Sequence, residues 1–181
     1  WYSWLFISKN KKNSLKIMYS PLLLNTKGIY LFLKIYKKMI HATPPKNFSP
    51  KAEVAACYVE HEWEILLLKR SNSGFFSNTW GTPGGKLDEW EHFTKAAIRE
   101  TFEETGITLD NDKIKFLEKV YVRHKDHDIL YYTHHYHIES KPDIILAPNE
   151  HQDFSWMTPK DALKINLIED EDLCIKKFFN I

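Results

Sequence analysis

The sequence predicts an α/β sandwich with a mixed β-sheet, and three observations lead to that fold class. From Lys51 onward, short apolar runs alternate with stretches of good helix formers, so strands and helices interleave along the chain. A stretch rich in glycine separates the first two apolar runs from the first helix. With 181 residues and a hydrophobic content of 43%, the chain is also large enough to bury one core.

Strands and helices are expected in a definite order. Residues 53–60 and 63–70 are apolar runs around a polar tip at His61 and Glu62, which predicts two strands joined by a tight turn. Residues 71–89 form a loop, since four glycines and a proline interrupt them. The remaining elements are a helix at 91–105 ended by Gly106, strands at 113–123, 129–140 and 153–158, and helices at 159–165 and 170–180.

The first part of the chain differs in charge from the rest. Residues 1–38 contain eight lysines and no Asp, Glu or Arg, so the remainder carries a formal charge of −7 within the total of +1. We expect residues 1–49 to be a basic extension and a proline-rich linker outside the core, and residues 50–181 to form the domain. An organelle targeting signal and a packed element are the alternatives for the extension. Its lysines argue against a membrane-spanning helix over residues 21–40.

The composition of the domain also limits its partners. A negatively charged globule disfavours a nucleic-acid polymer and favours divalent cations. Only Cys57 and Cys174 occur, far apart and outside any metal-ligand spacing, so we expect buried thiols in a reducing compartment and no catalytic cysteine. We therefore expect a cytoplasmic protein without a membrane partner, either a monomer or a homodimer.

The first predicted helix carries a group of acids. Glu100, Glu103 and Glu104 lie at i, i+3 and i+4, so their side chains emerge on one face within a turn. Carboxylates this close repel each other, and two of them sit in the last turn, where the helix dipole disfavours anions. A bound Mg²⁺ or Mn²⁺ would remove that conflict, and a solvated acidic face is the alternative. Ile98 and Phe102 are expected to point away from the acids and to anchor the helix in the core.

The residues before this helix complete a known pattern. Pro83, Gly84 and Gly85 let the backbone approach the helix and direct a carbonyl at the same cation. The stretch from Gly84 to Ile107 resembles the Nudix box, which runs Gly, five residues, Glu, seven residues, then Arg-Glu-aliphatic-any-Glu-Glu-any-Gly-aliphatic. One position departs from it, because Thr101 stands where an aliphatic residue is usual. The residues at the fixed positions are Gly85, Glu91, Arg99, Glu100, Glu103, Glu104 and Gly106.

This resemblance implies the Nudix α/β/α fold with a catalytic loop–helix–loop. The implied activity is Mg²⁺-dependent hydrolysis of a phosphoric anhydride bond in a nucleoside diphosphate derivative, with Mn²⁺ as a substitute for Mg²⁺. The resemblance also implies that Glu100, Glu103 and Glu104 bind the metal through their carboxylates. Gly84 would bind the same metal through its carbonyl oxygen.

Further residues are implied for catalysis. Arg99 and Glu91 resemble a charge pair that orients the metal-binding carboxylates. Glu150, in the loop before the last predicted strand, lies where MutT-like members carry a glutamate that approaches the metals and serves as the base. A surface glutamate is the alternative reading of Glu150. Glu103 and Glu104 compete for the role of base, so its identity stays open.

A group of histidines lies outside the box. Three readings apply: a Zn²⁺ site, contacts to a base or ribose, or ordinary strand histidines, of which the last is favoured. The five residues are His124, His127, His134, His135 and His137.

Marks outside the box bear on the substrate. Arg123 stands where many ADP-ribose hydrolases carry a proline, and neither the SQPW-type signature of NADH hydrolases nor the full coenzyme A signature is found. We therefore expect a MutT-like nucleoside triphosphate pyrophosphatase acting on a small nucleotide. Dinucleoside polyphosphate, ADP-ribose and nucleotide-sugar hydrolases are the alternatives. A catalytically silent Nudix-fold binding module and an isopentenyl diphosphate isomerase are rivals from other classes, and the intact acids of the box count against both.

Overall fold

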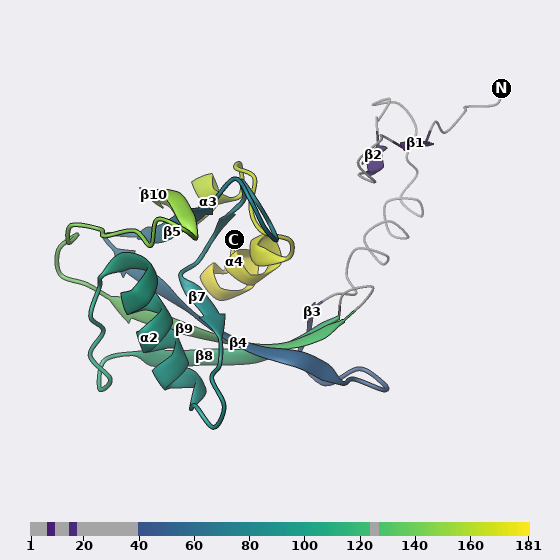
Figure 1. Ribbon diagram of the computed structural model, residues 1–181, viewed down its shortest axis with the longest axis horizontal. Helices are drawn as coiled ribbons and strands as arrows, with labels where there is room; N and C mark the ends of the chain where they lie inside the picture. The colour runs from purple at the N-terminus through teal and green to yellow at the C-terminus, as the bar shows by residue number, and fades with distance from the viewer. Residues whose placement is uncertain (1–6, 10–14, 18–39, 124–126) are drawn as a thin grey trace. The chain divides into compact units, whose positions relative to one another are not determined.

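The computed structural model describes residues 7–9, 15–17, 40–123 and 127–181 and divides the chain into two units, Trp1–Lys37 and Lys38–Ile181 (Figure 1). In the first unit, β1 (Ile7–Lys9) pairs antiparallel with β2 (Leu15–Ile17). The predicted extension lies largely outside the described residues, as does His124, and the division of the chain at residue 50 stays a prediction. Within the part described, no helix combines the length and apolar character needed to cross a membrane.

The second unit is built on one eight-stranded sheet. Six of its strands lie side by side in the order β10–β5–β4–β9–β8–β3, while β6 pairs with β5 and β7 pairs with β4. Strand β4 runs parallel to β9, and the other pairs are antiparallel, so the mixed sheet that the sequence predicts is confirmed. The strands are β3 (Ile40–His41), β4 (Pro50–His61), β5 (Glu64–Arg70), β6 (Trp80–Gly81), β7 (Gly84–Lys86), β8 (Lys115–Arg123), β9 (Asp128–His137) and β10 (His151–Met157).

Helices cover both faces of this sheet (Figure 1). The helices are α2 (Phe93–Thr105), α3 (Pro159–Ala162) and α4 (Glu171–Phe179). Side chains of a strand alternate between its two faces, and β4 uses both. Cys57 and Val59 join the core cluster that holds Ala97 of α2, whereas Tyr58 joins the cluster that holds Ile175 of α4. The α/β/α sandwich is therefore confirmed.

The predicted hairpin between β4 and β5 is present, with its turn one residue later than expected. Glu62 and Trp63 form a two-residue loop, since His61 pairs with Glu64. Both loop residues have positive φ, 46° and 70°, as in the type I′ turns that suit the twist of a hairpin.

Two short strands, β6 and β7, lie in the segment that the sequence predicts as loop. They escaped prediction because they span only two and three residues and contain glycines, which carry no strand signal. The segment predicted to lie outside the core also contacts the sheet: β3 pairs with β8, and the Arg123 guanidinium donates to the carbonyls of Lys46 and Asn47 in the linker. Arg123 further forms an ion pair with Asp128 at 2.8 Å, so it ties this segment to the sheet.

Helix α2 turns a face of small side chains to the sheet. Ala97, Thr101 and Thr105 are fully buried on this face, because residues four apart share one side of a helix. The Thr101 hydroxyl donates to the Ala97 carbonyl at 2.7 Å. This hydrogen bond gives the buried hydroxyl a partner at the box position where an aliphatic residue is usual. The prediction that Phe102 anchors the helix is wrong, since its position, one residue along from Thr101, is rotated outward and is 54% exposed. Gly106 ends the helix with φ 74°, as predicted.

Candidate functional site

The site lies where β7 passes between β4 and the last turns of α2. Gly84 and Gly85 pair with Ala56 and Ala55 of β4. A Cβ on Gly84 would lie 2.5 Å from the Ala55 carbonyl oxygen, and a Cβ on Gly85 would lie 2.5 Å from a carboxylate oxygen of Glu100. The two glycines thus leave room for the strand on one side and for an acid on the other, which is the close approach that the sequence predicts.

Glu104 is the most enclosed of the three predicted helix acids. It is 3% exposed, and both of its oxygens are engaged. Oε2 accepts the Gly84 N–H at 2.8 Å, and Oε1 lies 2.7 Å from His151 Nε2. The structure therefore shows Gly84 in contact with Glu104 through its N–H group. Metal binding through its carbonyl stays a prediction.

Arg99 connects the other acids. Its guanidinium forms two hydrogen bonds with Glu91, at 2.7 and 3.0 Å, and one of its nitrogens reaches both Glu100 at 2.8 Å and Glu103 at 3.0 Å. It also donates to the Lys86 carbonyl at the end of β7. The hydrogen bonds from Arg99 lower the pKa of Glu91. One cation thus holds three carboxylates around the end of β7, in the place where an orienting pair was predicted.

The three helix acids differ in exposure. The side chains of Glu100 and Glu104 are 15% and 4% exposed, whereas that of Glu103 is 54% exposed. Burial raises the pKa of Glu100, and the charges of Glu104 and Glu103 raise it further, while Arg99 lowers it. Burial is the largest cause of this shift, and the repulsion that the sequence pattern predicts adds to it. A bound cation would favour the ionised form of the carboxylate.

Glu150 lies beside this group in space. It occupies the turn before β10, and oxygen and nitrogen atoms of Glu104, Glu150 and His151 all lie within 4.8 Å of one another. Asp153, the nearest other acid along the chain, is exposed, and its carboxylate accepts the N–H of Phe154. Of the acids near the last strand, the structure thus brings Glu150 toward the box.

His151 was not singled out by sequence reasoning, although it directly follows Glu150. The residue is 5% exposed, and its contact with Glu104 spans 47 residues of sequence. The sequence places His151 in the loop before the strand predicted at 153–158, and a polar loop residue gives no sign of a partner so far away along the chain.

The donor set fits a hard divalent cation. Glu104 and Glu100 contact β7, Glu103 shares Arg99 with Glu100, and Glu150 approaches Glu104. Carboxylate oxygens are the ligands that Mg²⁺ and Mn²⁺ prefer. Because Gly85 has no Cβ, the Glu100 carboxylate can occupy a position from which an alanine methyl group would displace it. In the described part of the chain, Glu104 and Glu150 lie close enough to share an ion, with His151 beside them, and Glu100 and Glu103 are the further acids near it on the helix.

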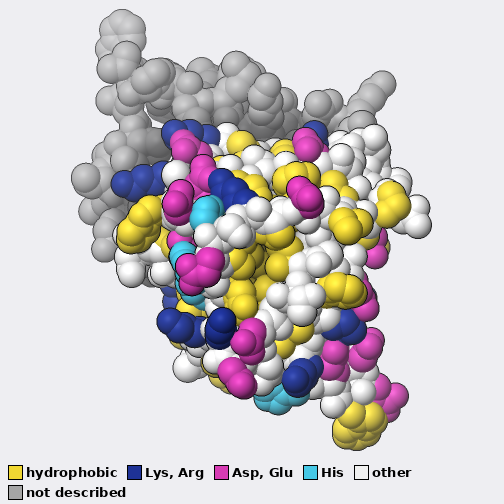
Figure 2. Space-filling model, turned by 90° about the vertical axis from the view of Figure 1, so that its left-hand side faces the viewer, with side chains coloured by type: hydrophobic (Ala, Val, Ile, Leu, Met, Phe, Trp, Pro, Cys, Tyr) yellow, Lys and Arg dark blue, Asp and Glu magenta, His cyan; other side chains and the backbone are white. Residues whose placement is uncertain are grey.

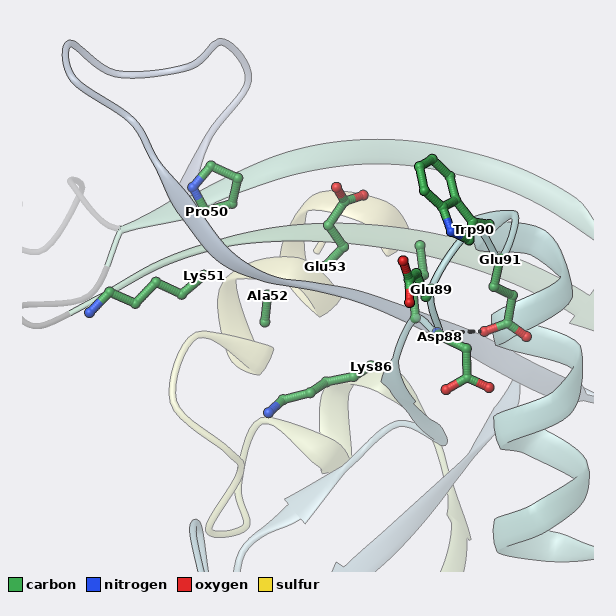
Figure 3. A pocket seen from close by; sticks show the side chains of 10 residues that line it. Pro50, Lys51, Ala52, Glu53, Lys86, Asp88, Glu89, Trp90 and Glu91 are labelled. Carbon is green, nitrogen blue, oxygen red and sulfur yellow. Dashed lines mark hydrogen bonds between the residues drawn. The ribbon is translucent and has the colours of Figure 1, made fainter.

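A groove of about 530 Å³ adjoins this site, lined by residues 50–53 and 86–91 (Figure 3). Glu91 belongs both to the groove and to the network around Arg99. Lys51 and Lys86 add positive charges to a lining whose other residues are half acidic and half apolar. Trp90 lies at its rim with 92% of its surface exposed. Figure 2 shows a face on which acidic, basic and histidine side chains border apolar ones. The volume of the groove lies within the range of sites that bind small molecules.

The histidines of β9 have partners of their own. His135 and His137 both approach Glu60, at 3.1 and 3.7 Å, and His134 is fully buried beside the Ala56 carbonyl. In the described part of the chain, the residues grouped closely enough to hold a metal ion do not include these histidines. The contacts favour ordinary strand histidines over a Zn²⁺ site.

Burial raises the pKa of both cysteine thiols, which suits the predicted lack of a catalytic cysteine.

Known proteins share this architecture. The NUDIX domain family model matches residues 50–178. The CTP pyrophosphohydrolase of Escherichia coli is 30% identical over 117 residues, which cover 64% of this chain and 82% of that protein. The asymmetrical bis(5′-nucleosyl)-tetraphosphatase of Caenorhabditis elegans is 31% identical over 125 residues, with the same coverage.

Solved structures agree in fold. A MutT NUDIX hydrolase from Burkholderia pseudomallei superposes with a TM-score of 0.61 at 24% identity, over 71% of this chain and 97% of that one. A C. elegans Ap4A hydrolase binary complex gives a TM-score of 0.56 at 26% identity, over 71% and 96% of the two chains.

Proposed function

The chain belongs to the Nudix family, and from that premise we propose that it is a metal-dependent hydrolase that cleaves a nucleoside triphosphate to a nucleoside monophosphate and pyrophosphate. The observation that carries the proposal is the set of intact box acids gathered around the end of β7 by Arg99 and the backbone of Gly84. An anionic diphosphate would be repelled by these acids alone. A bound divalent cation would neutralise phosphate oxygens and lower the pKa of an attacking water.

Different residues of this chain have different roles in the proposed reaction. Glu104 has hydrogen-bond donors on both oxygens, which suits a fixed ligand better than a proton acceptor. Glu103 is the most exposed of the helix acids, and Glu150 faces the same space from the turn before β10. We infer that one of these two takes the proton of the water as its oxygen attacks phosphorus and the bridging P–O bond breaks. General-base catalysis of this kind contributes about 10²–10⁴-fold in rate.

The groove beside the box supports a nucleotide substrate. With the phosphates at the acids, the remainder of the substrate would extend along residues 86–91 and 50–53. A CTP pyrophosphohydrolase among the relatives favours a triphosphate. A bis(5′-nucleosyl)-tetraphosphatase of equal similarity makes a dinucleoside tetraphosphate the second candidate.

A substrate panel with Mg²⁺ tests the proposal. The full chain is incubated with the common nucleoside triphosphates, a dinucleoside tetraphosphate, ADP-ribose and a nucleotide sugar, with and without chelator, and products are separated by ion-exchange chromatography. We expect a nucleoside monophosphate and pyrophosphate from a triphosphate, and no product with chelator. Preferred cleavage of the tetraphosphate supports the second candidate, and no metal-dependent product from any substrate rejects both.

The cytoplasmic location and the monomeric or dimeric state stay predictions.

A further inference from the structure

His151 is placed to control the geometry of Glu104. It is the first residue of β10, where it pairs with Arg70 of β5, and its backbone N–H donates to the Ala147 carbonyl at 3.0 Å. The side chain is 4% exposed, as is that of Glu104. The ring is therefore held by a sheet strand and reaches the carboxylate oxygen that Gly84 does not contact.

The contact between the two side chains has one direction. A carboxylate that binds a cation is ionised and only accepts hydrogen bonds, so in that state His151 Nε2 is the donor to Glu104 Oε1, which lies 2.7 Å away. Among the described residues, the other ring nitrogen, Nδ1, is buried without a hydrogen-bond partner. The bond to Glu104 is thus the polar contact that the ring makes.

We propose that His151 is a positioning residue, which together with the Gly84 N–H fixes the plane of the Glu104 carboxylate toward the cation. Each N–H occupies one oxygen, so the carboxylate cannot rotate without breaking a hydrogen bond. Because Glu150 immediately precedes His151, the same turn brings the Glu150 carboxylate to the site and places the His151 ring against Glu104. This inference rests on the proposed function, since it assumes that Glu104 binds the metal.

Binding of Mn²⁺ to the metal-stripped full chain tests the inference without turnover. Isothermal titration calorimetry gives the affinity of the wild type, His151→Phe and His151→Gln. Phe keeps a ring and removes the donor, and we expect its Mn²⁺ affinity to fall by about 10–100-fold, as for other residues that orient a metal ligand. Gln restores an N–H at a similar reach and is expected to bind within about threefold of the wild type.

Two controls separate this role from a structural one. His134→Phe removes another buried ring and should leave Mn²⁺ affinity unchanged, with circular dichroism confirming that each variant is folded. In a Glu104→Gln background, His151→Phe should add little further loss, because His151 acts through Glu104.

Each outcome has a definite meaning. No Mn²⁺ binding by the wild type rejects the proposed function. Binding by the wild type with equal affinity in His151→Phe overturns the positioning role alone. The role is also overturned if Gln is as weak as Phe, or if the losses from His151 and Glu104 simply add.

Discussion

Adding one methyl group at either of two neighbouring glycines should have opposite consequences. In Gly84→Ala, the new Cβ would lie 2.5 Å from the Ala55 carbonyl oxygen and 2.6 Å from Ala56 Cα, about 1 Å short of ordinary van der Waals contact. Backbone atoms of a central strand cannot move aside cheaply. In Gly85→Ala, the new Cβ meets the Glu100 carboxylate, the far end of a flexible side chain.

The expected magnitudes follow from these neighbours. Overpacking against rigid atoms costs about 1–3 kcal/mol and sometimes more, so we expect Gly84→Ala to lower the free energy of unfolding by about 3 kcal/mol. Gly85→Ala should change it by less than about 1 kcal/mol, since Glu100 can rotate and the loss of a glycine stabilises by a few tenths. The displaced carboxylate should nevertheless lower turnover by about 10²-fold, as a 1 Å misplacement can.

Urea denaturation followed by circular dichroism measures the first effect, and Mg²⁺-dependent release of pyrophosphate measures the second. The expected pattern is an unstable variant at Gly84 and a stable, inactive one at Gly85. The reasoning is refuted if Gly85→Ala is destabilised as much as Gly84→Ala, or if it keeps the turnover of the wild type.

Three further predictions concern other sites. Glu103→Gln should lower kcat by at least about 10²-fold if Glu103 is the base. Its melting temperature should stay close to that of the wild type, because the Glu103 side chain is 54% exposed. Turnover near that of the wild type would assign the base to Glu150. Burial raises the pKa of Glu171 above its usual 4.5, so the folded chain holds this proton more tightly than the unfolded chain, and stability should fall as pH rises from 4.5 through the raised pKa. Melting temperatures of Glu171→Gln and wild type should therefore diverge in favour of the variant as the pH rises above 4.5, and a constant difference would contradict this. Replacing Glu62 and Trp63 by Asn and Gly, which prefer the positive φ of this turn, should raise the free energy of unfolding by about 1 kcal/mol in urea titrations, whereas a loss would show that the exposed Trp63 packs usefully.

Elements with a strong local signal could be predicted from the sequence. The long apolar runs became β4 and β5, and Gly106 ended α2 with the positive φ that favours glycine. The strands β6 and β7 could not be predicted, because their few residues gain stability from pairing with β5 and β4 and not from their own propensity. Phe102 was misplaced for a related reason, since hydrophobicity alone does not tell which side of α2 the sheet covers.

The sequence by itself determined the family, the mixed α/β architecture and the grouping of three carboxylates on one helical turn. These depend on motif spacing and on a helical repeat of 3.6 residues, both of which are local. Only the tertiary structure decided that Glu104 is buried between Gly84 and His151 while Glu103 stays exposed. That choice depends on how β7 inserts beside β4 and on where β10 begins along β5, so residues 47 positions apart meet through strand register, which no local pattern encodes.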